Sequence, residues 1–171
     1  MVVLRPFTED LLSVVQPWFL HPEVNRWLGG PEWPARTFEA GEDSSTFRGR
    51  RVLRGHSWVA VDEAGDVVAQ IGGEIYDHWY HDEPGPAMGL AYVVDPQRWR
   101  QGIGTAALLA VMSSPEVADA VLFAAGIEPE NTASVRCALA AGLRPDSPIP
   151  DFEGIVYHLR RFPERGADVV E

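Results

Sequence analysis

The chain has 171 residues, a size that suits one domain with a full apolar core and no need for disulfides or metals. Its formal net charge is −11, and all 14 basic residues are arginines, because the sequence contains no lysine. Such acidity argues against nucleic-acid and membrane partners, and it either attracts a cationic partner or simply keeps the protein in solution. A single cysteine, Cys137, and the absence of a secretion signal or a long apolar run favour a cytoplasmic location.

The first half of the chain predicts short helices followed by paired strands. Thr8 is a candidate N-cap, and Gly29-Gly30 is a helix stop. In chain order the pattern predicts a strand at 4–7, a helix at 8–19, a helix at 21–28, a loop at 31–55 with a short helix at 36–40, and strands at 57–61 and 67–76.

The second half predicts alternating strands and helices. In chain order these are a polar connection at 77–86, a strand at 87–94, a helix at 102–112, a strand at 121–125, a helix at 131–141 and a strand at 154–159. Gly142 follows the second helix at the position that favours a positive φ. This order predicts a mixed α/β sheet with helices on its faces, in one domain over residues 1–162 with a mobile tail at 163–171.

The junction between the strand at 87–94 and the helix at 102–112 carries the clearest chemical signal. Its segment 98–105, RWRQGIGT, places Gly102 and Gly104 where the helix begins. A helix N-terminus presents N–H groups without intrahelical partners, and glycine lets an anion approach the backbone closely. Arg98 and Arg100 add positive charge, so the junction predicts a phosphate-binding site.

Three interpretations of this junction are open at this point. The first is packing alone. The second is a dinucleotide site, because Gly102, Gly104 and Ala107 match the Gly-x-Gly-x-x-Gly/Ala spacing. The intervening loop at 95–101 and the lack of an acidic residue directly after 121–125 argue against that site. A nucleoside-triphosphate loop is excluded because the chain has no Gly-Lys-Ser/Thr triplet.

The third interpretation comes from a resemblance. The run from Tyr92 to Leu108 resembles motif A of the GNAT superfamily of acetyl-CoA-dependent N-acetyltransferases. Residues 131–143, NTASVRCALAAGL, are similar to the family's Asn-x-x-Ser/Ala and Gly-Phe segment, and the resemblance extends over residues 2–162. Within the superfamily the chain is most similar to aminoglycoside 6′-N-acetyltransferases and ribosomal-protein N-terminal acetyltransferases. The resemblance implies one α/β (α+β) domain with a mixed, mostly antiparallel sheet flanked by helices.

The resemblance also implies which residues hold acetyl-CoA, the cosubstrate. It assigns the strand backbone at 92–94 to the pantetheine arm, the N–H groups at 99–105 to the diphosphate, and the 131–134 turn to the region near the thioester. The implied cofactor-binding residues are Tyr92, Val93, Val94, Trp99, Arg100, Gln101, Gly102, Ile103, Gly104, Thr105, Asn131 and Ser134. No metal is expected.

The catalytic groups depart from the family pattern. Many members use a tyrosine seven residues after the conserved asparagine as general acid, and this chain has Ala138 there. Ser134, a water molecule or departure of an unprotonated thiolate would replace it. Glu74 and Asp77, in the acidic segment before the cofactor strand, are the candidates for a general base, unless that segment is only a solvated loop.

The function expected from these residues is acetyl transfer from acetyl-CoA to an amine. The leading acceptor is a small cationic polyamine or an aminoglycoside-like molecule, and the alternative acceptor is a protein N-terminal α-amine. From a different class comes an acyl-CoA-binding module with little or no turnover. Candidate walls of the acceptor pocket are Trp27, Trp33, Trp79 and Tyr80. His78 and His81 are expected to be surface residues, and the protein to be a monomer or a homodimer.

Overall fold

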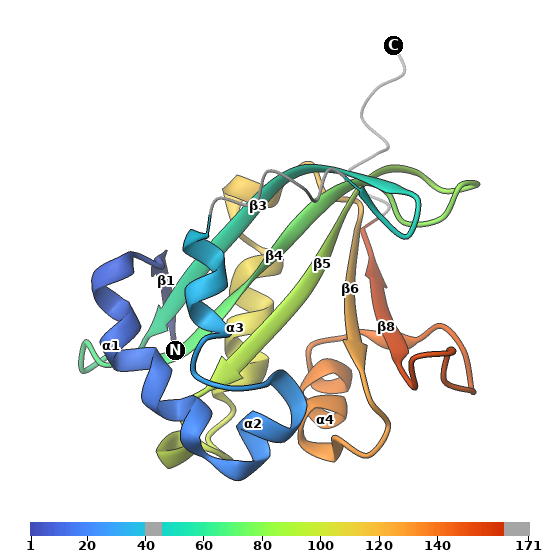
Figure 1. Ribbon diagram of the computed structural model, residues 1–171. Helices are drawn as coiled ribbons and strands as arrows, with labels where there is room; N and C mark the ends of the chain where they lie inside the picture. The colour runs from blue at the N-terminus through green and yellow to red at the C-terminus, as the bar shows by residue number, and fades with distance from the viewer. Residues whose placement is uncertain (40–45, 163–171) are drawn as a thin grey trace.

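One twisted sheet organises residues 1–39 and 46–162, which are the residues that the computed structural model describes (Figure 1). Its strands lie in the order β1-β3-β4-β5-β6-β8-β7, and β2 pairs with β3 off this path. The strands are β1 Val3–Pro6, β2 Thr46–Phe47, β3 Arg50–Val61, β4 Val67–His78, β5 Pro84–Val94, β6 Leu122–Ile127, β7 Arg144–Pro145 and β8 Val156–Arg161.

The strand pairing is antiparallel except between β5 and β6, which run parallel. Parallel neighbours need a crossover connection, and here it passes through helix α3. The expected mixed, mostly antiparallel sheet flanked by helices is therefore confirmed. Among the described residues, no helix combines the length and apolar character that crossing a membrane requires.

Helices cover both faces of the sheet. The α-helices are α1 Leu12–Val15, α2 Pro22–Leu28, α3 Ile103–Met112 and α4 Thr132–Ala140. In Figure 1, α3 lies behind the strands and the blue N-terminal helical segments lie in front. Alternation along β5 separates the two cores: Leu90 packs with α3, whereas Val93 packs with the N-terminal segments.

The N-terminal helical region is broken rather than continuous. The predicted helix at 8–19 forms a 3₁₀ turn at Glu9–Leu11, helix α1, and a second 3₁₀ segment at Gln16–Leu20. Pro17 contributes to the break because proline lacks the N–H that an α-helix needs. Thr8 occupies the predicted N-cap position, with an extended backbone, but its side chain makes no cap hydrogen bond.

Strands β3, β4 and β5 extend beyond the predicted limits. The predicted loop at 31–55 ends early, because β3 already begins at Arg50 and pairs with β4 through Val52↔Tyr76. The arginines at the start of β3 interrupt the apolar alternation that predicts a strand. One of them, Arg50, packs its guanidinium 4.0 Å from the centre of the Trp79 ring. The connection predicted at 77–86 is likewise shorter. The expected mobile tail at 163–171 and the last residue of the 36–40 helix lie outside the described residues.

Candidate active site

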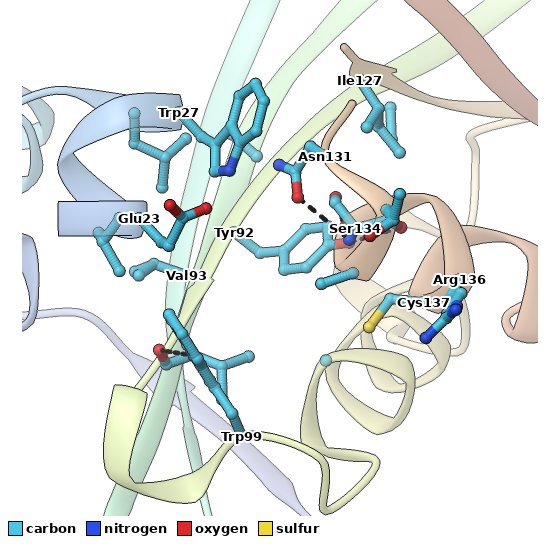
Figure 2. A pocket seen from close by; sticks show the side chains of 18 of the residues that line it. Glu23, Trp27, Tyr92, Val93, Trp99, Ile127, Asn131, Ser134, Arg136 and Cys137 are labelled. Carbon is cyan, nitrogen blue, oxygen red and sulfur yellow. Dashed lines mark hydrogen bonds between the residues drawn. The ribbon is translucent and has the colours of Figure 1, made fainter. Parts of the chain in front are cut away.

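A cleft of about 610 Å³ opens where β5 and β6 separate (Figure 2). The two strands pair from Ala87↔Leu122 to Leu90↔Ala125, and no further pair joins them within residues 1–39 and 46–162. Figure 1 shows the strands diverging toward α2 and α4. The cleft walls come from α2, β5, the β5–α3 loop, the first turn of α3, the end of β6 and α4.

The β5 wall offers backbone groups to the cleft. The Asp95 N–H donates to the Val68 carbonyl oxygen at 3.0 Å, so alternation along the strand turns the N–H groups of Val94 and Tyr92 away from β4. The N–H of Val93 faces β4 instead, and its side chain is buried under the N-terminal helices. Of the three predicted strand positions, Tyr92 and Val94 therefore present N–H groups to the cleft.

Trp99 occupies the carbonyl oxygen of one of these strand residues, Val94. Its indole Nε1 donates to the Val94 carbonyl oxygen at 3.0 Å, and its ring packs edge-on against His21 with centroids 4.6 Å apart. The Val94 carbonyl is thus already paired, which leaves the Val94 N–H as the open group. Trp99 is 39% exposed at the cleft and ties the β5–α3 loop to the start of α2.

The β5–α3 loop has an unusual backbone. Arg100 has φ 64° and Gly102 has φ 74°, so a non-glycine residue lies in the left-handed region. Such backbone turns gather N–H groups into an anion-binding concavity. Within residues 1–39 and 46–162, no N–H group from Trp99 to Thr105 has a protein acceptor. A Cβ added to Gly102 would meet no atom within 4 Å, so open space lies beside these donors.

The charge at this loop differs from the sequence expectation. Arg98 does not serve as a free cation, because its guanidinium binds Asp62 at 2.5 Å and lies 3.8 Å from Asp66. This hydrogen bond lowers the pKa of the Asp62 carboxyl. Arg100, by contrast, lines the cleft and has no carboxylate partner in the described part of the chain. The positive charge available for an anion at this loop therefore comes from Arg100.

The α4 wall begins with a side-chain cap. Asn131 Oδ1 accepts a hydrogen bond from the Ser134 N–H at 3.3 Å, which leaves the Asn131 amide NH₂ as a donor for the cleft. The Ser134 hydroxyl lies 2.7 Å from the Tyr92 hydroxyl, across the cleft floor (Figure 2). Burial raises the pKa of Tyr92, so this phenol stays protonated at neutral pH.

Gly104 has a packing role as well as a position at the predicted anion site. A Cβ at this residue would lie 3.0 Å from Cys137 Sγ and 3.5 Å from the Tyr92 ring. The glycine therefore lets α3 approach α4 and β5. Of the predicted cofactor-binding residues, Gln101 and Thr105 do not line the cleft, although their N–H groups belong to the loop and the first turn of α3.

The candidate bases lie outside the cleft lining. Glu74 on β4 pairs with Gly89 of β5 and accepts a hydrogen bond from the Tyr76 hydroxyl at 3.0 Å. Gly89 shares a sheet face with Ala91, which lines the cleft about 7 Å further along the strand. Burial, followed by the negative charge of Glu74, raises the pKa of Tyr76.

Asp77 is occupied by its neighbours. It accepts from the Arg51 backbone N–H at 2.9 Å and lies 2.8 Å from His78 Nδ1, close to the β4–β5 hairpin. The His78 and His81 rings are 4.6 Å apart. No group of three or more His, Cys, Asp or Glu side chains in the described ranges could hold a metal ion.

Of the four predicted aromatic wall residues, Trp27 lines the cleft. Trp33 stacks on Phe19 with centroids 5.5 Å apart, Trp79 is buried, and Tyr80 donates its hydroxyl to Asp146.

Four charged residues of the cleft escaped the sequence interpretation. They are Glu23, Glu128, Glu130 and Arg136. The spacing of Glu23 and Trp27, four residues apart on one helix, places both on the same face and was the one signal available from sequence. The glutamates come from α2 and from the β6–α4 loop, which meet only in the folded chain.

Comparisons with known proteins agree with this architecture. The acetyltransferase (GNAT) domain family matches residues 2–144, whereas a search of the curated proteins found no match. A structure of the aminoglycoside acetyltransferase AAC(6′)-Ib with coenzyme A has a TM-score of 0.70 and 18% identity, covering 96% of each chain.

Two further structures show the same fold. The aminoglycoside N(6′)-acetyltransferase of Legionella pneumophila has a TM-score of 0.70 and 14% identity, covering 96% of this chain and 94% of that one. The GNAT domain of S. lividans PAT has a TM-score of 0.68 and 15% identity, covering 94% of this chain and 90% of that one. At such identities these structures establish the fold, and the family match extends over most of the chain. The chain therefore belongs to the GNAT acetyltransferase family.

Proposed function

We propose that this enzyme transfers the acetyl group of acetyl-CoA to a small cationic amine, a polyamine or an aminoglycoside-like molecule. The observation that carries the proposal is the composition of one cleft, in which unpaired backbone donors and carboxylates converge. The donors suit an anionic cofactor with an amide-containing arm. The carboxylates of Glu23, Glu128 and Glu130 suit an ammonium group.

The residues present fit coenzyme A. The N–H groups at 99–105, backed by Arg100, would hold the diphosphate, because free helix-terminal amides and a nearby guanidinium both favour an anion. The β5 edge at Tyr92 and Val94 would pair with the pantetheine arm like an added strand, with the Asn131 amide opposite. The bound cofactor supplies an acetyl group activated as a thioester.

The acceptor is expected on the α2 side of the cleft. Figure 2 shows Glu23 and Trp27 on α2 facing Asn131 across the cleft. The Arg26 guanidinium lies 3.9 Å from the Glu23 carboxylate and 4.3 Å from the centre of the Trp27 ring, so an acceptor ammonium group would share this counter-ion and this cation–π surface with Arg26. Glu74 lies on the sheet face that carries Ala91 and Val93, the face on which the N-terminal helices pack. Solved structures of AAC(6′)-Ib contain ribostamycin or kanamycin, which supports an acceptor of this class.

The reaction requires a neutral amine, a polarised carbonyl and a route for protons. Glu74 would take the ammonium proton through water, since it lies one strand away from the cleft, and Asp77 is the weaker candidate because its neighbours occupy it. One of the two cleft-facing N–H groups of β5, at Tyr92 or Val94, would polarise the thioester carbonyl, and the other would pair with the pantetheine arm. Ser134, hydrogen-bonded to Tyr92, would supply a proton to the departing sulfur. We place the enzyme in the cytoplasm, as a monomer or a homodimer.

A thiol-release assay tests the proposal. The protein is incubated with acetyl-CoA and, separately, spermidine, kanamycin or a short unblocked peptide, and free coenzyme A is measured. Release with spermidine or kanamycin, with the acetylated amine seen by mass spectrometry, supports the proposed acceptor class. Release with the peptide alone shows an N-terminal acetyltransferase. Tight acetyl-CoA binding without release for any amine shows a binding module.

A further inference from the structure

Arg136 is a cation of the cleft that has no counter-ion among the described residues. The side chain is exposed on α4, lines the cleft, and has no hydrogen-bond or ion-pair partner within residues 1–39 and 46–162. Other arginines of this lysine-free chain are held by carboxylates. These pairs are Arg48 with Asp151 and Glu153, Arg54 with Asp119, Arg98 with Asp62, and Arg161 with Glu83.

The position of Arg136 relates it to the anion site of the cleft. Its neighbour Cys137 has its Sγ 3.0 Å from the point where a Cβ on Gly104 would lie, so this part of α4 borders the first turn of α3. Figure 2 shows Arg136 beside Cys137, on the α3 side of the cleft. Arg136 and Arg100 thus come from different walls of the same cleft. Both line the cleft into which the backbone donors of the β5–α3 loop open.

Coenzyme A carries two anionic groups, the diphosphate and a phosphomonoester on the ribose 3′ oxygen. The loop N–H groups and Arg100 already supply donors for the diphosphate. A phosphomonoester carries a charge of roughly −1.5 to −2 at neutral pH and is repelled by a protein of net charge −11 unless a local cation compensates. A guanidinium matches two phosphate oxygens with two parallel N–H donors.

We propose that Arg136 binds the ribose 3′-phosphate of the cofactor and makes the enzyme prefer coenzyme A over its 3′-dephospho form. This assignment rests on the proposed function, because it presumes that coenzyme A lies in the cleft. Arg136 recognises the terminal phosphate, whereas Arg100 and the loop amides recognise the diphosphate that both forms share.

The test compares two ligands and four proteins by calorimetry. Coenzyme A and 3′-dephospho-coenzyme A are titrated into the wild type and into Arg136→Gln, Arg100→Asn and Arg36→Gln. Arg36 is exposed and outside the cleft lining, so its variant matches the charge change alone. A loss of charge-assisted hydrogen bonds predicts that Arg136→Gln weakens coenzyme A binding by ~10-fold or more. The same variant changes dephospho-coenzyme A binding less than about 2-fold.

The controls separate the alternatives. Arg100→Asn is expected to weaken the binding of both ligands to a similar extent, and Arg36→Gln is expected to weaken the binding of neither. Equal losses on both ligands for Arg136→Gln, with an unchanged thermal midpoint, would overturn the assignment, as would no loss on either ligand. A wild type that binds neither ligand would instead refute the proposed function.

Discussion

The anion site proposed at the start of α3 makes a sharp prediction at Gly102. Its φ of 74° is one that Asn and Asp tolerate, and a Cβ there would meet no atom within 4 Å. Gly102→Asn and Gly102→Asp are nearly equal in shape and share the same backbone cost of roughly 1 kcal/mol. They differ in one negative charge, placed beside N–H groups that have no protein acceptor in the described ranges.

The charge difference has a calculable size. A carboxylate about 5 Å from a bound diphosphate, at an effective dielectric constant of about 20 to 40, costs about 2 to 3 kcal/mol. The Kd for coenzyme A is therefore expected to be roughly 30- to 150-fold higher for Gly102→Asp than for Gly102→Asn. Added salt should reduce this ratio, because the Debye length falls from about 10 Å at 0.1 M to about 3 Å at 1 M.

Stability and binding move in opposite directions in this pair. A negative charge at a helix N-terminus stabilises the helix, so Gly102→Asp should unfold at a temperature no lower than Gly102→Asn. Weaker binding by the more stable variant cannot come from a damaged fold. Calorimetry measures the Kd of coenzyme A for both variants, and thermal denaturation measures their unfolding midpoints. Equal Kd values for the two variants would show that no diphosphate lies at this loop.

Three further changes probe other parts of the molecule. Glu74→Gln is expected to lower kcat by roughly 10²-fold or more without changing the Kd of coenzyme A, as steady-state kinetics and calorimetry measure, and an unchanged kcat excludes Glu74 as the base. Gly104→Ala should cost about 1 to 3 kcal/mol in urea unfolding, because its Cβ would lie 3.0 Å from Cys137 Sγ, and Cys137→Ala in the same chain should restore most of it. Unrestored stability would place the strain elsewhere. The hydrogen bond from Arg54 lowers the pKa of Asp119, so this pair stabilises the protein above the unfolded-state pKa of Asp, about 4, and the stability is lost as pH falls through the folded pKa. The thermal midpoint of the wild type should consequently drop further between pH 6 and pH 3 than that of Asp119→Asn, and parallel curves would contradict the linkage.

Local patterns in the sequence were sufficient to predict the elements that surround the proposed anion site. The apolar run before Asp95 and the glycines at 102 and 104 predicted the strand, the loop and the start of α3, and these are confirmed. Gly142 was expected at a positive φ, and it has φ 88°. Each of these features depends on residues a few positions apart, for which backbone sterics and helix periodicity give direct rules.

The contacts that set the charge of the site depend on distant residues. Arg98 was expected to bind an anion, but Asp62, 36 residues earlier, holds it through the β3–β4 turn. The 42-residue separation of Tyr92 and Ser134 likewise hides their hydroxyl contact from any local pattern. Arg136 lies in the segment 131–143 that resembles the family, but the resemblance assigned it no role, and Glu23 enters the cleft from a separate helix. Such pairs follow from the three-dimensional path of the chain rather than from propensity or periodicity.

The separation of β5 from β6 has a mechanical consequence. Four residue pairs, Ala87 to Leu90 with Leu122 to Ala125, form the ladder between the two halves of the sheet in the described part of the chain, and the Val121 N–H donates to the Pro86 carbonyl oxygen beside it. Beyond them no ladder crosses the gap within residues 1–39 and 46–162, and the halves are joined by the Tyr92–Ser134 hydroxyl contact and by the packing of α3 against α4. A ligand arm lying between these edges would add hydrogen bonds across the gap. These hydrogen bonds would reduce the motion of the β5 half relative to the β6 half, which carries α4 and the Asn131 turn.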